Sequence, residues 1–352
     1  MPDLRQAVEN VTDPELGRSL KELRMLAGVS EAADAVEVHV ELPTPAYPDR
    51  ERLAEAVRAT AAPLADGKRI DVRFSTVVRG KESGGSIGLK IKNVIAVGSG
   101  KGGVGKSTLA AAIAFGLKHF GAKVGLMDAD VYGPSIPHLL GATGQPAAIE
   151  QTGPDGQMVQ RIEPIEADGI KLISIGFFVE PGKAIVWRGP MLHRTIHQFL
   201  AQTEWGELDY LIIDMPPGTG DVSLSLSQML GLAGAVVVCT PQQVALLDAV
   251  KAIDMFHTVK IPVLGMVENM SGDIFGRGGA RRKAAELGIP FLGEVPIEAG
   301  IRERGDAGRI ADLFAQDNPS REPLVHVAQR TAIEIARQAV VETRGMPSLE
   351  IL

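Results

Sequence analysis

The chain has 352 residues, of which 45% are hydrophobic and 22% charged, so it is long enough for one large globular domain and a smaller one. A formal net charge of −7 argues against non-specific binding to nucleic acid, which usually requires a basic surface. No apolar run approaches the roughly 20 residues of a membrane span, and the N-terminus lacks a signal-peptide pattern. We therefore expect a cytoplasmic protein whose partners include neither nucleic acid nor a membrane.

A single cysteine restricts the chemistry further. Cys239 allows no disulfide within the chain, and no metal site built from cysteine alone in one chain. It lies in the apolar run 235–239, which predicts the interior of a strand. A buried, unreactive thiol is the simplest interpretation.

Residues 1–78 predict a small α+β domain. Apolar residues recur at helical spacing over 3–11 and 50–62, and they alternate with polar residues over 36–42 and 70–74. Two helices and two half-buried strands in this order can enclose a small core of their own.

A glycine-rich stretch over 79–92 predicts a flexible linker to a second domain over 93–346. In that domain short apolar runs alternate with helical patterns, and the last helix is expected near 323–344. This alternation predicts an α/β fold with a doubly wound, mostly parallel sheet, which binds ligands at the carboxyl ends of its strands. The expected strands are 94–97, 123–127, 171–175, 210–213, 235–239, 262–267 and 290–292.

The loop after the first of these strands carries the strongest motif. It satisfies the phosphate-loop spacing G-x-x-x-x-G-K-[ST] between a predicted strand and a predicted helix. In such a loop backbone N–H groups surround a phosphate, the lysine reaches the β- and γ-phosphates, and the serine hydroxyl binds Mg²⁺. The expected nucleotide-binding residues are Gly100, Lys101, Gly102, Gly103, Val104, Gly105, Lys106, Ser107 and Thr108.

Carboxylates follow two further predicted strands. Asp214 ends an apolar strand, as in a Walker B element, and would bind Mg²⁺ through its water shell. Asp128 and Asp130 follow the strand 123–127, where they either hold a water beside the phosphates or cap the next turn. Asp221 is either functional or the N-cap of a helix that starts at 222.

The segment 101–107, Lys-Gly-Gly-Val-Gly-Lys-Ser, resembles the deviant Walker A loop of the MinD/ParA/ArsA-like ATPases. The resemblance implies a homodimer that sandwiches ATP, in which Lys101 crosses the interface to the partner's nucleotide. It also implies that Asp130, with Asp128 second, orients the attacking water. Asn269 matches the asparagine that reads the adenine edge in related ATPases, and a turn-forming asparagine is the alternative.

More of the chain resembles the Mrp/ApbC branch of these ATPases, most of whose members are regarded as carriers of Fe–S clusters. The resemblance implies catalytic roles for Lys101, Lys106 and Asp130. Ser107 and Asp214 would hold Mg²⁺, and Fe–S assembly proteins or apo-protein clients would be the partners. The matching segments are 187–191, 205–210, 214–221, 240–242 and 267–271, with 13–17 and 43–48 similar to an Fe–S-assembly-type domain.

One feature of this family is absent from the sequence. A C-x-x-C pair usually follows the Asn-Met-Ser segment and holds a [4Fe–4S] cluster between two subunits. Here Ser271 is followed directly by Gly-Asp-Ile-Phe-Gly, so the usual bridging site cannot form. His193 and His197, four residues apart, are more simply exposed helix residues than replacement ligands. The shortened loop is predicted to carry a basic patch of three arginines, Arg277, Arg281 and Arg282.

Two functions are therefore open to an ATP-driven switch of this kind. The family role is the carriage or assembly of Fe–S clusters. The alternative is a nucleotide-gated adaptor that binds assembly partners or apo-proteins without holding a cluster, and the single cysteine favours it. A ParA-like partner of DNA or membrane is disfavoured by the acidic charge balance.

Overall fold

The computed structural model describes residues 2–80, 87, 89–152, 157–179, 189–218 and 220–343. Contacts divide the chain into two units, Met1–Arg79 with Ala336–Leu352, and Gly80–Ile335. The domain boundaries expected at 78 and 93 stay predictions. So does the flexible linker between them, because residues 81–86 and 88 lie outside the described ranges.

The smaller unit contains a three-stranded sheet in the order β1-β2-β3. Strand β1 pairs antiparallel with β2, and β2 pairs in parallel with β3. Both predicted strands and both predicted helices of this region are present, whereas β1 was missed because Leu-Ala-Gly-Val-Ser-Glu has no apolar alternation. The elements are α1 (Pro2–Glu9), β1 (Leu26–Glu31), β2 (Ala35–Leu42), α2 (Arg50–Ala61), η1 (Ala62–Leu64) and β3 (Arg69–Thr76).

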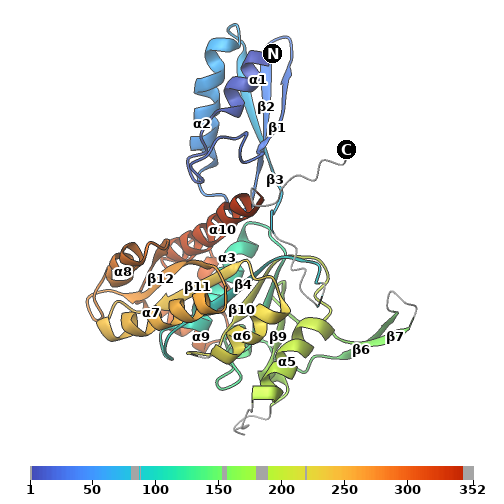
Figure 1. Ribbon diagram of the computed structural model, residues 1–352, viewed down its shortest axis with the longest axis vertical. Coiled ribbons are helices and arrows are strands. Elements are labelled where there is room, and N and C mark those ends of the chain that lie inside the picture. The colour runs from blue at the N-terminus through green and yellow to red at the C-terminus, as the bar shows by residue number, and fades with distance from the viewer. Residues whose placement is uncertain are drawn as a thin grey trace. The chain divides into compact units, whose positions relative to one another are not determined.

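The larger unit is built on an eight-stranded sheet in the order β13-β12-β11-β4-β10-β5-β9-β8. All neighbouring pairs are parallel except β8 with β9. The seven predicted strands are all present, and Figure 1 shows β12, β11, β4 and β10 in this order across the sheet. The strands are β4 (Ile91–Gly98), β5 (Val124–Asp128), β6 (Ala148–Thr152), β7 (Met158–Ile162), β8 (Ile165–Ala167), β9 (Ile170–Ser174), β10 (Leu208–Asp214), β11 (Gly234–Cys239), β12 (Val263–Ser271) and β13 (Phe291–Pro296).

Helices cover both faces of this sheet. One face packs apolar residues of α5, α6, α7 and α8 against the strands in a single buried cluster. The other carries α3, whose Phe115 ring lies 6.2 Å from that of Phe314 and whose Gly116 lies directly against Ala328 of α10. The helices are α3 (Lys106–His119), α4 (Ile136–Leu139), η2 (Ile175–Phe177), α5 (Gly189–Gln202), α6 (Gly220–Met229), α7 (Gln243–Thr258), α8 (Gly279–Leu287), α9 (Ala299–Asp306), η3 (Ile310–Phe314) and α10 (Arg321–Thr343).

The strand register brings the carboxyl ends of three central strands together. Asp214, the last residue of β10, is paired with Val97 on one side and with Asp128 on the other. Asp128 in turn is paired with Ser174, the last residue of β9. The sheet therefore places the phosphate loop and both acidic strand ends at one edge, where ligands bind in open α/β sheets.

Two features of the larger unit were not predicted, the β6–β7 hairpin and the short strand β8. In the described ranges, no helix combines the length and the apolar character that a bilayer crossing needs.

Candidate functional site

The phosphate loop joins the end of β4 to α3, which begins at Lys106 as predicted. Gly103 and Gly105 have positive φ values of 77° and 81°, a conformation that favours glycine. A Cβ atom on Gly105 would lie 2.2 Å from Nδ2 of Asn269, so no side chain fits there. The start of α3 adds free N–H groups and a partial positive charge. The loop therefore has the backbone shape and the polarity that a phosphate group requires.

Two close approaches hold this loop against its neighbours. A Cβ atom on Gly100 would lie 2.0 Å from the carbonyl oxygen of Asp248, so the loop passes directly against α7. The N–H of Gly218 donates to the carbonyl oxygen of Ser99 at 3.0 Å. The segment that follows Asp214 is thus in direct contact with the phosphate loop.

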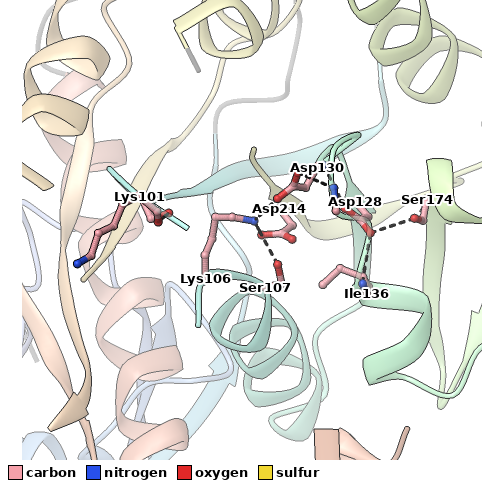
Figure 2. Close-up of polar contacts among 10 residues, drawn as sticks. Lys101, Lys106, Ser107, Asp128, Asp130, Ile136, Ser174 and Asp214 are labelled. Atoms are coloured by element: carbon pink, nitrogen blue, oxygen red, sulfur yellow. Dashed lines mark hydrogen bonds and ion pairs between the residues drawn. The ribbon is translucent and has the colours of Figure 1, made fainter. Parts of the chain in front are cut away.

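Lys106 lies at the centre of a buried charge cluster, drawn in Figure 2. Its Nζ donates to Oδ1 of Asp214 at 2.6 Å and lies 3.4 Å from Oδ2 of Asp130. The Oγ of Ser107 lies 3.2 Å from the same nitrogen. Lys106 is only 6% exposed and Asp214 is fully buried, so each charge needs the other to offset its lost hydration. Because the cluster contains more carboxylates than ammonium groups, it can accept a further cation that is bound to a phosphate.

Asp128 has a structural part in this cluster. One of its oxygens accepts the N–H of Asp130 at 3.1 Å, and the other accepts the N–H of Ile136 at 3.3 Å and the hydroxyl of Ser174 at 3.0 Å. Burial, and then the nearby Asp214 carboxylate, raise the pKa of Asp128 to about 8. Asp128 thus shapes the turn that positions Asp130, and Ser174 is a site residue that no sequence motif had indicated.

The donor set at Asp214 fits Mg²⁺. Oδ2 of Asp214 is buried and has no hydrogen-bond partner in the part of the chain that the structure describes. Burial raises the pKa of Asp214 while the Lys106 ammonium opposes the rise, so a second cation would further favour the ionised form. In the described ranges no three His, Cys, Asp or Glu side chains gather as a metal site. Mg²⁺ needs no such group, because one or two protein oxygens, waters and phosphates complete its coordination.

A cavity of about 630 Å³ opens beside the phosphate loop. Gly105, Thr108 and Asn269 line it, together with the charged residues Glu298, Arg302 and Asp306. The Nδ2 of Asn269 donates to the carbonyl oxygen of Val104 at 2.8 Å. Because a carbonyl can only accept, this bond assigns the amide orientation and leaves Oδ1 and the second N–H for further partners. The apolar lining includes Leu139, Met270, Ile274, Pro296 and Ile297.

Lys101 does not join the cluster of Lys106. Figure 2 shows its side chain turned away from Asp214, on the other side of the loop. Within the described ranges no hydrogen bond or ion pair of its ammonium group is found. The expectation that Asp221 caps a helix from 222 is wrong, because α6 already begins at Gly220.

Cys239 is buried at the end of β11, as predicted. Burial, together with the neighbouring Glu268 carboxylate, raises the pKa of its thiol to about 12. Both oxygens of Glu268 accept backbone N–H groups at 2.6 Å, from Gly278 and Ala280 at the start of α8. Glu268 is a buried charged residue that sequence patterns did not single out.

The remaining predicted candidates lie on the surface. His193 and His197 are exposed on α5, and Nδ1 of His193 lies 3.0 Å from Oγ of Ser225. The expected basic patch is corrected in part, since only Arg277 lies in the short loop. The other two, Arg281 and Arg282, belong to α8 because the helix already starts at Gly279.

Both the larger and the smaller part of the chain match known protein families. Residues 90–332 match the ParA family model, described as "NUBPL iron-transfer P-loop NTPase", and residues 2–73 match a model described as "Iron-sulfur cluster assembly protein". A protein of Synechocystis named "Iron-sulfur cluster carrier protein" is 43% identical over 346 residues, which cover 94% of this chain and 96% of the relative. A protein of the same name from Deinococcus radiodurans is 44% identical over 349 residues, covering 96% and 97%.

Solved structures agree with this placement. A nucleotide-binding protein from Archaeoglobus fulgidus, in complex with ADP, has a TM-score of 0.54 and 38% sequence identity. The match covers 66% of this chain and 91% of that one. A MinC:MinD complex from Aquifex aeolicus, at 20% identity and a TM-score of 0.50, shares the fold over 68% of this chain and 94% of its own. The doubly wound fold expected from the sequence is thereby confirmed.

Proposed function

This chain belongs to the ParA family of iron-transfer P-loop NTPases, and from that premise we propose that it is a Mg²⁺-dependent ATPase whose nucleotide cycle switches a homodimer. The observation that carries the proposal is the cluster around Lys106. A phosphate-loop lysine meets Asp214 and Asp130 at the carboxyl ends of parallel strands, beside a free helix N-terminus.

Each residue of the cluster has a distinct role in the proposal. Lys106 binds the β- and γ-phosphates, exchanging its carboxylate partners for phosphate oxygens. Ser107 and Asp214 hold Mg²⁺, which neutralises charge on the phosphates. Asp130, 3.4 Å from the lysine and tied to the turn by Asp128, positions the attacking water. These roles require no movement of the strands, because the register already brings the residues together.

The base preference follows from the orientation of Asn269. One N–H of its amide donates to the carbonyl oxygen of Val104, which fixes the amide orientation and leaves its oxygen to accept a hydrogen bond from a base. The exocyclic amino group of adenine is a donor and satisfies this oxygen. The corresponding O6 of guanine is also an acceptor, so O6 and the Asn269 oxygen would face each other with no proton between them. Adenine nucleotides should therefore bind in preference to guanine nucleotides.

The homodimer follows from Lys101. Figure 2 shows its side chain directed away from its own Lys106, and Lys101 is partly exposed, so its ammonium is available to a second copy. From there it would place positive charge on the phosphates of the partner's nucleotide, as an arginine finger does.

The role of the switch is taken from the relatives, which are named Fe–S cluster carrier proteins. We propose that this chain acts in Fe–S carriage or assembly, with the cluster as cargo and assembly proteins or apo-proteins as partners. The buried Cys239 and the missing C-x-x-C pair favour a specific form of this role. In that form the chain is an ATP-gated adaptor, and a partner holds the cluster.

Two measurements test this function. Purified protein should hydrolyse ATP only with Mg²⁺ and with a clear preference over GTP, and absence of ATP turnover in the presence of Mg²⁺ would contradict the enzyme assignment. Anaerobic reconstitution with iron and sulfide, followed by desalting, then separates carrier from adaptor. About four iron and four sulfide per dimer would show a bound cluster and refute the adaptor form, whereas no retained iron beside intact hydrolysis supports it.

A further inference from the structure

The segment between β12 and α8 folds into a closed hairpin, which we call the 272–276 hairpin. Gly272 and Gly276 bond each other twice, N–H to carbonyl, at 2.9 and 2.7 Å. Their φ values of 151° and 87° lie in the range that favours glycine. Three residues, Asp273, Ile274 and Phe275, form the tip of the hairpin.

Contacts on both sides hold the hairpin in place. Glu268, which is fully buried, accepts the N–H groups of Gly278 and Ala280 where the chain leaves the hairpin. On the other side the N–H of Ile297 donates to the carbonyl oxygen of Ser271 at 2.9 Å. These contacts fix both ends of the hairpin, so its tip has a defined position.

The tip carries an apolar side chain that faces the cavity beside the phosphate loop. Ile274 is 74% exposed, more than any other large hydrophobic side chain in the described part of the chain. It lines the cavity of about 630 Å³ together with Ile297, which is 41% exposed. Gly105 and Thr108 of the phosphate-loop region also line this cavity.

We propose that the 272–276 hairpin is a flap for the purine base, and that Ile274 packs on the face of the ring. The inference rests on the proposed nucleotide function and names a contact within it. Phosphates held at the start of α3 leave the base in the adjoining cavity, with its polar edge at Asn269 and its faces toward Ile274 and Ile297. An apolar ring face and two exposed isoleucines each lose contact with water when they meet.

The first test compares ligands with and without a base. In Ile274→Ala the affinity for ATP and ADP should fall about fivefold to tenfold, from the lost apolar contact. The affinity for inorganic triphosphate with Mg²⁺, which has phosphates but no base, should be unchanged. Ile274→Leu should restore most of the affinity. Leu287→Ala, which removes a 39% exposed leucine from α8, is the matched control and should bind all three ligands normally.

A fluorescence measurement gives a second test, which does not require the affinity of a weakly binding variant. In Ile274→Trp the added indole should change its fluorescence when ATP binds and stay unchanged with triphosphate, after subtraction of the wild-type signal. An equal loss of ATP and triphosphate binding in Ile274→Ala would show a disturbed phosphate loop and overturn the flap. Normal ATP affinity with a weaker dimer in sedimentation would assign Ile274 to an interface and also overturn it. If wild-type protein binds no ATP, the proposed function itself fails.

Discussion

The two ends of the proposed nucleotide site differ in nearly every physical property. The phosphate end, made of the loop before α3 with Asp130 and Asp214, is buried and charged, and its lysine is 6% exposed. The base end, made of Asn269, Ile274 and Ile297, is open and mostly apolar. Buried charges act on the charge that develops during reaction, whereas an apolar wall binds ground state and transition state alike. Changes at the phosphate end should therefore reduce kcat, and changes at the base end should mainly raise KM.

The largest effect is expected for Lys106→Ala. Removal of the ammonium leaves the buried carboxylates unpaired and the phosphates without their principal cation, so ATP turnover should fall by roughly 10³-fold. Steady-state phosphate release measures it. Lys92→Ala removes a surface lysine that pairs with Asp209 at 2.8 Å and should hydrolyse ATP normally. A Lys106→Ala protein with wild-type turnover would contradict the assignment of the phosphate end.

Lys101→Ala should reduce turnover by about 10²-fold while ATP still binds, because the lost charge acts on the partner's nucleotide. A mixing experiment distinguishes this from a role within one chain. Lys101→Ala chains mixed with Lys106→Ala chains should recover about a quarter of the wild-type rate, since about half the dimers are mixed and each contains one complete site. Absence of any recovery, when subunit exchange is shown independently, would place Lys101 in its own site.

Asp214→Asn should raise the Mg²⁺ concentration needed for half-maximal turnover by about tenfold or more, since a neutral amide holds the hydrated ion more weakly. A Mg²⁺ titration at saturating ATP measures the shift. Asp209→Asn, a change on the same strand at its opposite end, is the control. An unchanged Mg²⁺ requirement would remove Asp214 from the metal site.

The smallest effect is expected at Cys239. With a thiol pKa of about 12, native protein should react only slowly with a thiol reagent at pH 8 and rapidly once urea unfolds it. The folded pKa lies above the unfolded value of about 8.5, so this group's stabilising contribution is full below that pH and declines as the pH rises toward 12. Cys239→Ala gives the unlabelled baseline. Rapid labelling of the native protein would show that the reagent reaches Cys239 and would contradict a buried thiol at the end of β11.

The phosphate end was predictable because its signal is local. Strand, glycines, lysine and serine follow one another within 94–108, and the fold reproduces that order with α3 starting at Lys106. The seven strands were predictable for a related reason. Parallel strands buried on both faces consist of nearly continuous apolar residues. Short or exposed strands such as β1 and β8 carry no such pattern, and they were missed.

The base end and the support of Asp130 could not be predicted in this way. Ser174 reaches Asp128 across 46 positions of sequence. Asn269 reaches the phosphate loop across 165. Neither spacing has a period or a motif, and each pair meets only because the sheet register and the loop paths bring strand ends together.

The sequence by itself thus determined the fold class, the phosphate loop, the acidic strand ends and the lack of the usual cluster ligands. Those properties depend on residue type and on spacing along one stretch of chain. Only the tertiary structure decided that Asp128 accepts the N–H of Asp130 in the following turn and that Ile274 faces the cavity. It also decided that Glu268 accepts the N–H of Gly278 where the chain leaves the 272–276 hairpin. These properties depend on which distant backbone groups are left unpaired and which apolar surfaces remain uncovered, and both are settled only when the strands have packed.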